Sequence, residues 1–184
     1  MQFAARDRLG LPCRFAEYRQ GELHRDGRRY LPLIVLEVAG AWLGEERPLR
    51  LGVVDRHHRV DPALLGEDGT AQILSMLGTI AIQRGERRYG MLAERGSISA
   101  MPEIYGAAID VTVWEVERGH LPYETLYTEL LLDIGAGAIG VRTNVAAPSL
   151  AAKLGAERIV AGDSLQITRS RIDILGFVRA NSRS

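Results

Sequence analysis

Cysteine and lysine are almost missing from this chain of 184 residues. Cys13 is the single cysteine, which excludes an intrachain disulfide and a cysteine-based zinc cluster. Lys153 is the single lysine, and every other basic side chain except histidine is arginine. Lys153 falls in a short predicted helix, so a Schiff-base mechanism is not expected. The arginine bias is typical of a GC-rich prokaryotic genome.

Long apolar runs are also missing. No stretch approaches the 18 apolar residues that a membrane-spanning helix requires. The first fourteen residues carry Arg6, Asp7 and Arg8 and have no apolar core, which is unlike a signal peptide. Together with the cysteine content, this pattern predicts a protein without membrane contact in a reducing cytoplasm.

The chain has no net charge, because 23 basic residues balance 23 acidic ones. Zero net charge argues against non-specific binding to nucleic acid or to an anionic membrane, although it leaves room for a local basic patch. It also removes a general repulsion between copies, and several segments are apolar, so a homo-oligomer of unstated size is expected. A hydrophobic content of 46% and the chain length predict one compact domain over residues 1–184, with 1–107 and 108–180 as possible lobes.

Familiar catalytic motifs are absent from the sequence. There is no Ser-His-Asp order, no Cys-His pair, no H-E-x-x-H and no P-loop lysine. His57 and His58 are adjacent, and neighbouring residues on a strand point to opposite faces, so no metal site is predicted there. Whether the chain is an enzyme, and which cofactor it would use, stays open.

The most suggestive motif is a glycine cluster. Gly135, Gly137 and Gly140 form a G-x-G-x-x-G, the spacing of dinucleotide-binding loops. The run at 132–137, Leu-Asp-Ile-Gly-Ala-Gly, also resembles the first motif of Rossmann-type methyltransferases. That resemblance implies a loop that holds S-adenosylmethionine.

The surroundings of the glycines favour a different interpretation. The preceding residues 122–133 have helical spacing of apolar side chains, with Pro122 at the start and Gly135 after the end. Residues 138–145 are rich in β-branched side chains and predict a strand, where a nucleotide loop would need a helix. Only 44 residues follow Gly140, too few for the rest of a doubly wound sheet. We therefore expect no dinucleotide binding, and keep a methyltransferase only as the less favoured alternative.

The rest of the chain predicts an α+β fold, with a mainly antiparallel sheet or small barrel and two longer helices. The helices are expected at residues 70–83 and 122–133. Strands are expected at 13–18, 29–38, 49–54 and 108–116, with a hairpin turn at Asp26-Gly27. Residues 61–66 combine a cap, a proline and a terminal glycine, and predict one short helical turn.

The C-terminal part predicts a strand, a short helix and a second strand. A strand from Val141, a helix at 148–155, a turn at Gly162-Asp163 and a strand to Thr168 follow one another. This order looks like a unit of cradle-loop and double-psi barrels, and is similar to the end of archaeal riboflavin kinases. Beyond Thr168 the apolar residues change from odd to even positions, which requires a bulge, bend or turn near residues 169–171.

Two polar groups are candidate ligand-binding residues. If residues 169–173 are extended, Arg169, Arg171 and Asp173 share a face, where two arginines would grip a phosphate or carboxylate and Asp173 would orient one of them. Arg142 and Asn144 also share a strand face, close after the glycines, where they would face a ligand held by the glycine turn. The alternative is a solvent-facing ladder of ion pairs. Glu103 and Tyr105 offer an acid and a phenol without known partners.

Two classes of function remain. The first is a protein that binds a small anionic ligand near the glycine turn and the arginine pair; the residues involved are Gly135, Gly137, Gly140, Arg142, Asn144, Arg169, Arg171 and Asp173. The second is a non-catalytic, self-associating structural or interaction protein. A polar pocket that joins Arg142, Arg171 and the glycine turn would favour the first class.

Overall fold

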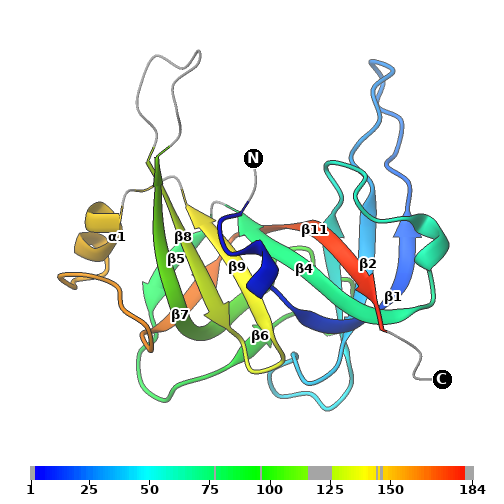
Figure 1. Cartoon of the computed structure of the whole chain (residues 1–184). Helices are drawn as coiled ribbons and strands as arrows, with labels where there is room; N and C mark the ends of the chain where they lie inside the picture. Colours follow the sequence, from blue (N-terminus) through cyan, green and yellow to red (C-terminus); the bar gives the residue numbers. More distant parts are fainter. Residues whose placement is uncertain are drawn as a thin grey trace.

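The computed structural model describes residues 3–76, 78–95, 97–115, 126–143, 145 and 147–180. Within these residues the protein is nearly all-β (Figure 1). Eleven strands form one continuous sheet, and the only α-helix that the described residues contain is α1, Ala147–Lys153. No helix in this part of the chain has the length and apolar character needed to cross a bilayer.

Five strands close into a mixed barrel. They follow the order β1-β2-β3-β11-β4, and β4 pairs with β1 to complete the ring. All neighbours are antiparallel except β3 and β11, which are parallel and joined by the single pair Val54–Asp173. The strands are β1 (Leu11–Arg19), β2 (Leu33–Val38), β3 (Leu49–Val54), β4 (Asp68–Met76) and β11 (Arg171–Arg179).

Two of these strands continue beyond the barrel as one long ribbon. β4 leads into β5 (Thr79–Ile82), and β10 (Ser164–Thr168) leads into β11. Met76 pairs with Arg171 and Thr79 with Thr168, so the antiparallel register is the same on both sides of the interruption. At the interruption the buried hydroxyls of Ser75 and Ser170 lie 2.5 Å apart. The ribbon therefore bends here without losing its register.

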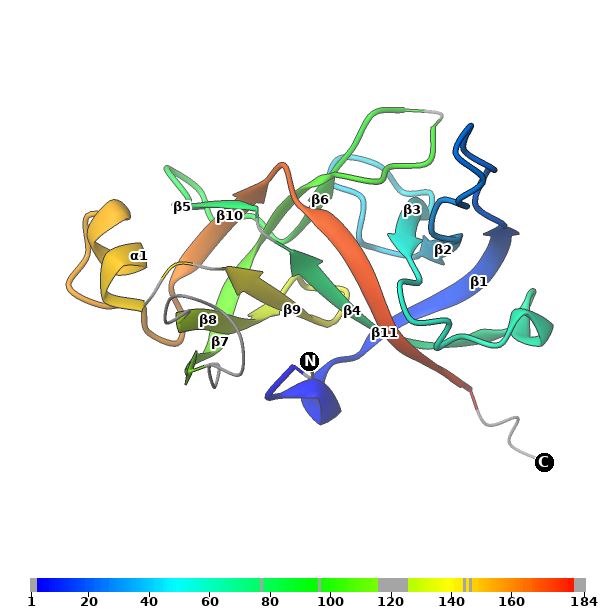
Figure 2. The ribbon, with the colours of Figure 1, turned by 90° about the horizontal axis from the view of Figure 1, so that it is seen from above.

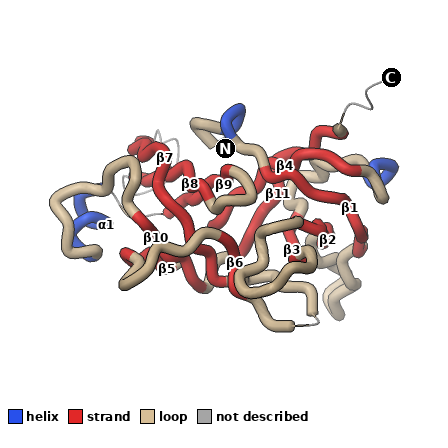
Figure 3. The backbone as a smooth tube through the Cα atoms, turned by 90° about the horizontal axis from the view of Figure 1, so that it is seen from below, coloured by secondary structure: helices blue, strands red, loops and turns tan. Residues whose placement is uncertain are grey.

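The remaining strands form a second ring on the same ribbon. From β4 the pairings run through β9 (Ala138–Thr143), β8 (Leu126–Asp133) and β7 (Glu103–Glu115) to β10. β6 (Gly90–Leu92) pairs with the start of β7. Figure 2 shows the two groups of strands on either side of the ribbon, with α1 at the end far from β1. Figure 3 shows how little of the described part of the chain is helical.

The N-terminal segment covers the outer face of this sheet. Phe3 and Leu9 pack with Leu74, Leu131 and Leu175 in a small apolar cluster, separate from the main core. The segment includes a single 3-10 turn, η1 (Arg6–Arg8). Because the N-terminal segment covers them, β4, β8 and β11 carry apolar side chains on the outer face of the sheet as well as on the core face.

The α+β prediction is wrong, and the helix expected at residues 70–83 shows why. These residues form β4 and β5. Ile73 points into the core while Leu74 lies under the N-terminal segment. Burial on both faces removed the alternation of apolar and polar residues, and what remained had the spacing of a helix.

The second expected helix, at residues 122–133, is wrong for the same reason. Residues 126–133 form β8, and residues 122–125 lie outside the described residues. Leu130 and Leu132 belong to the main core, whereas Leu131 faces the N-terminal segment. A continuous apolar run of this kind fits a fully buried strand as well as a helix.

Other local predictions are confirmed. The strand at 49–54 has the expected bounds, and Gly27 lies in a turn with a φ of 82°. Asp61 caps the short turn η2 (Pro62–Leu64), its side chain accepting a hydrogen bond from the Ala63 N–H. β9, α1 and β10 give the strand, short helix and strand of the C-terminal part, and the apolar phase changes at the bend around Ser170. The strand expected at 29–38 is shorter and begins at Leu33.

Candidate anion-binding site

Two arginines, one on β11 and one in the loop after β3, share a carboxylate at the start of β11. Arg171 donates to Asp173 twice, from Nε to Oδ1 at 2.7 Å and from Nη2 to Oδ2 at 3.1 Å. Arg56, just after β3, places its Nε 3.6 Å from Asp173 Oδ2. The carboxylate side chain is 9% exposed, whereas the Arg171 and Arg56 side chains are 41% and 44% exposed. The group therefore presents surplus positive charge to solvent.

The fold explains this arrangement. Arg171 and Asp173 lie two residues apart on a strand, so their side chains share a face. The single β3–β11 pair, Val54–Asp173, brings the end of β3 alongside. Asp55 is buried and accepts the backbone N–H groups of Arg59 and Val60 at 2.9 and 3.1 Å, which fixes the loop that carries Arg56.

Further arginines lie on the connections next along the sheet. Arg19 pairs with Leu33, Leu33 with Val54 and Val54 with Asp173, so the end of β1, the start of β2, the end of β3 and the start of β11 follow one another laterally. The Asp55 N–H donates to the Pro32 carbonyl at 3.1 Å, which joins the loop after β3 to the connection between β1 and β2. Residues 19–31, 55–59 and 169–173 hold eight arginines and four carboxylates. Zero net charge thus conceals a basic stretch of the barrel, formed by these three segments, which we call the arginine end.

Arg169 also belongs to the arginine end. It is exposed and forms no ion pair with any residue that the structure describes. Its φ of 55° places it in the left-handed region, at the bend of the ribbon. The expectation that Arg169 shares a face with Arg171 and Asp173 required an extended backbone, and this bend breaks the extension.

Arg142 is placed differently. Its Nε donates to Glu129 Oε1 at 2.8 Å, and its Nη2 is also bonded to that oxygen. The second carboxylate oxygen accepts the backbone N–H of Ala4 at 2.7 Å. Glu129 and Arg142 are 2% and 4% exposed, so this pair lies beneath the N-terminal segment, away from solvent.

Each of the three glycines has a packing or turn role. Gly135 has a φ of 80° in the tight turn between β8 and β9, where its N–H donates to Asp133 at 2.8 Å. A side chain at Gly137 would overlap the Gly10 carbonyl, and a Cβ at Gly140 would lie 2.9 Å from Leu74 and 3.0 Å from Phe3. A strand, and not the expected helix, precedes this turn, and a strand follows it as expected.

The structure does not bring the described members of the predicted site together around one group. Arg142 and Arg171 both pair with Met76 in the sheet, one from each side, but each guanidinium is bonded to its own carboxylate. Gly135 and Gly137 lie at the opposite end of β9 from Arg142. Asn144 lies outside the described residues. Sequence reasoning missed Arg56, although the run Asp55-Arg-His-His-Arg59 was a visible signal of a polar loop.

Glu103 and Tyr105 have partners in the structure. The Tyr105 hydroxyl donates to Glu103 at 2.6 Å, and Gln166 donates to both at 3.1 Å. Arg88 lies 3.9 Å above the Tyr105 ring. Burial, and then the hydrogen bond to Glu103, raises the pKa of Tyr105. The phenol is thus held protonated as a donor within a structural cluster.

Metal and thiol chemistry receive no support from the described residues. They contain no group of three histidine, cysteine or acidic side chains arranged to hold a metal ion. Cys13 is buried, and desolvation raises its pKa to about 12. Its thiol is therefore protonated and unreactive near neutral pH.

Comparison with known proteins returned no relative: no family model, curated protein or solved structure matches the chain.

Proposed function

We propose that this protein binds a phosphate-bearing ligand at its arginine end. The observation that carries the proposal is the Asp173 carboxylate held between Arg171 and Arg56. The Asp173 carboxylate orients two guanidinium groups. Each of them keeps N–H donors that Asp173 does not bind. Guanidinium groups match the geometry of phosphate and carboxylate oxygens, and orientation before binding lowers the entropic cost of binding.

Neighbouring side chains extend the same chemistry. His57 and His58 are exposed in the loop that follows β3, and Arg169 lies at the bend two residues before β11. These groups donate hydrogen bonds to an anion from several directions. A ligand with more than one phosphate therefore gains further contacts along this end of the barrel.

The architecture supports the same location. Five-stranded, partly open barrels of the OB type bind oligonucleotides and oligosaccharides through the loops between their first and second and their fourth and fifth strands. The closed barrel here also has five strands, and the connections in those places are residues 20–32 and the path from β4 to β11. The likeness concerns architecture alone and does not identify the ligand.

The test is a titration of the full chain at low salt. Inorganic phosphate is followed by NMR at the backbone amides of residues 55–59 and 169–173. A labelled single-stranded oligonucleotide, followed by fluorescence anisotropy, separates a small phosphate ligand from a nucleic acid. The double variant Arg56→Gln, Arg171→Gln is expected to weaken phosphate binding about tenfold or more, since two charge-assisted contacts are lost.

The matched control is Arg158→Gln, which removes an exposed arginine outside the arginine end. It is expected to leave the affinity unchanged. Absence of saturable shifts, or an equal loss in the control, contradicts the proposal.

Self-association stays a second proposal. Leu23, Tyr30 and Leu31 are 64%, 60% and 41% exposed on the connection between β1 and β2, an apolar surface that a second copy would cover. Sedimentation at low micromolar concentration tests it, and a single species at the 20.2 kDa chain mass would exclude it. A cytoplasmic location also remains a proposal, supported by the single, buried, protonated Cys13.

A further inference from the structure

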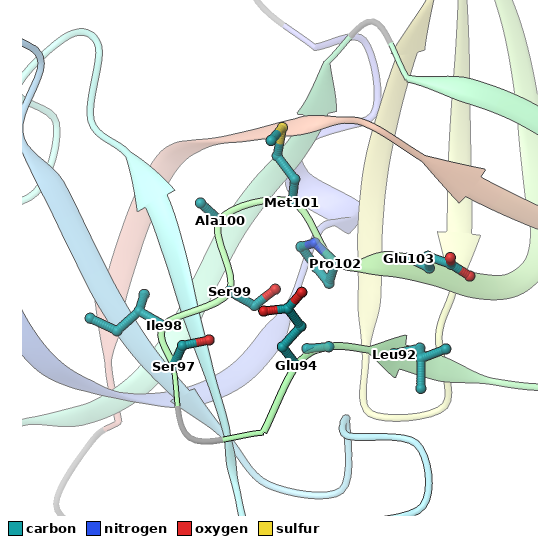
Figure 4. A pocket seen from close by; sticks show the side chains of 10 residues that line it. Leu92, Glu94, Ser97, Ile98, Ser99, Ala100, Met101, Pro102 and Glu103 are labelled. Carbon is teal, nitrogen blue, oxygen red and sulfur yellow. The ribbon is translucent and has the colours of Figure 1, made fainter.

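The loop between β6 and β7 encloses a cleft that the proposed function does not use. Its volume is about 520 Å³, and the residues that line it lie between Leu92 and Glu103 (Figure 4). β6 and β7 pair as a hairpin, so the two ends of the loop are held together. Compact loops with paired ends are frequently functional.

The loop is anchored to the barrel at both sides of the cleft. The Trp42 indole N–H donates to the Ala93 carbonyl at 3.3 Å. On the other side the Ser99 N–H donates to the Arg50 carbonyl at 2.9 Å, and the Gly52 N–H donates to the Ser99 carbonyl at 2.8 Å. Arg95, which does not line the cleft, pairs with Glu45 at 2.6 Å. The cleft walls are therefore positioned before any ligand arrives.

Three polar side chains at this cleft have no partner among the residues that the structure describes. They are the Glu94 carboxylate and the hydroxyls of Ser97 and Ser99. Figure 4 shows the Glu94 carboxylate pointing across the loop toward Ser99 and Pro102, whereas Glu103 points away. No arginine, lysine or histidine is among the lining residues. The cleft thus offers acceptors and one negative charge.

Apolar side chains complete the lining. Met101 is 64% exposed and Leu92 is 42% exposed, and Pro102, which also lines the cleft, lies near the Glu94 carboxylate in Figure 4. An ammonium group carries three N–H donors in a tetrahedral arrangement. One carboxylate and two hydroxyls supply three acceptors, and the apolar wall suits an alkyl chain.

We propose that this cleft binds the ammonium group of a primary alkylamine. Glu94 supplies the opposite charge, Ser97 and Ser99 accept the remaining N–H donors, and Pro102 contacts the alkyl chain. This cleft would bind a cation, whereas the arginine end would bind an anion. The two proposals can therefore be tested independently.

The test uses butylamine and the full chain, followed by NMR at the backbone amides of residues 97–101. Saturable shifts are expected with butylamine but not with butanol, which has no charge. Tetramethylammonium has the charge but no N–H donor, and is expected to bind several-fold more weakly. Glu94→Gln keeps the shape of the side chain and is expected to weaken butylamine binding about tenfold or more.

The matched control is Glu157→Gln, an exposed glutamate between α1 and β10 that does not line the cleft. It is expected to leave butylamine binding unchanged. Phosphate titration of Glu94→Gln separates this site from the arginine end, because phosphate binding should be unaffected. Equal shifts with butanol, or unchanged binding by Glu94→Gln, would overturn the proposal.

Discussion

Two arginine–carboxylate groups lie on the same sheet and are used in opposite ways. Glu129 and Arg142 are both buried, and the N-terminal segment adds the Ala4 N–H to their network. Asp173 is nearly buried, but its partners Arg171 and Arg56 are 41% and 44% exposed. In the first group a buried arginine bonds to a buried glutamate, whereas in the second one nearly buried acid serves two half-exposed arginines.

The difference separates a structural pair from a candidate site. A buried charge needs its partner, because loss of one leaves the other desolvated. An exposed guanidinium keeps its hydration, so breaking its ion pair costs little. The same two residue types thus hold the fold together in one place and remain available to a ligand in the other.

The largest expected effect comes from the buried pair. Glu129→Gln removes the charge of the carboxylate to which Arg142 Nε and Nη2 bond, and should lower the free energy of unfolding by about 3–5 kcal/mol. Urea denaturation measures this change. Asp110→Asn, which breaks the exposed Arg8–Asp110 pair, is the control and should cost under about 1 kcal/mol. Equal effects of the two variants would remove the distinction drawn here.

Restoring neutrality inside the sheet is the second prediction. The double variant Glu129→Met, Arg142→Met should be about 1–3 kcal/mol more stable than Glu129→Gln alone, because it removes the buried charge of Arg142 as well. The same denaturation curves provide the measurement. A double variant that is less stable than the single one would mean that the pair stabilises by more than mutual neutralisation.

Removing the charge of Asp173, which lies between Arg171 and Arg56, is expected to destabilise the fold less. Asp173→Asn should cost about 1 kcal/mol, since the two arginines that it releases stay hydrated. Phosphate affinity should fall as well, because the guanidinium groups are no longer oriented. A loss of stability as large as that of Glu129→Gln would show that Asp173 is a structural residue.

The smallest expected effect on stability is that of Arg56→Gln with Arg171→Gln. These exposed side chains should contribute under about 1 kcal/mol to unfolding. Added salt should weaken phosphate binding by the parent chain but barely change the loss caused by Glu129→Gln, because salt screens exposed charges and not buried ones. Isothermal titration at two salt concentrations measures the phosphate affinity. Urea denaturation at the same two concentrations measures the stability lost in Glu129→Gln.

Sequence reasoning succeeded where burial is one-sided or a turn has strict backbone demands. The strand at 49–54 and the turn at Asp26-Gly27 are such cases. It failed for β4 and β8, since Leu74 and Leu131 are covered by Phe3 and Leu9 from the far end of the chain. The sequence of the covered strand does not show that a distant segment packs on its outer face.

The candidate site was visible only in its local part. Arg171 and Asp173 are two residues apart, and their shared face follows from the period of a strand. Arg56 reaches them through a single parallel pair between distant strands, which no spacing in the sequence reveals. Arg142 had the same local pattern as Arg171, and only its burial beside Glu129 distinguishes the two.

The ribbon that both rings share also orders events during synthesis. Four strands of the closed barrel are complete at Met76, but the fifth begins at Arg171, after 94 further residues. At ribosomal rates of about 5–20 residues per second, the edges of β3 and β4 wait about 5–20 s for β11. During that interval they are unpaired edges, able to pair with other chains. Most of the closed barrel is therefore translated before the second ring, but the barrel closes after it.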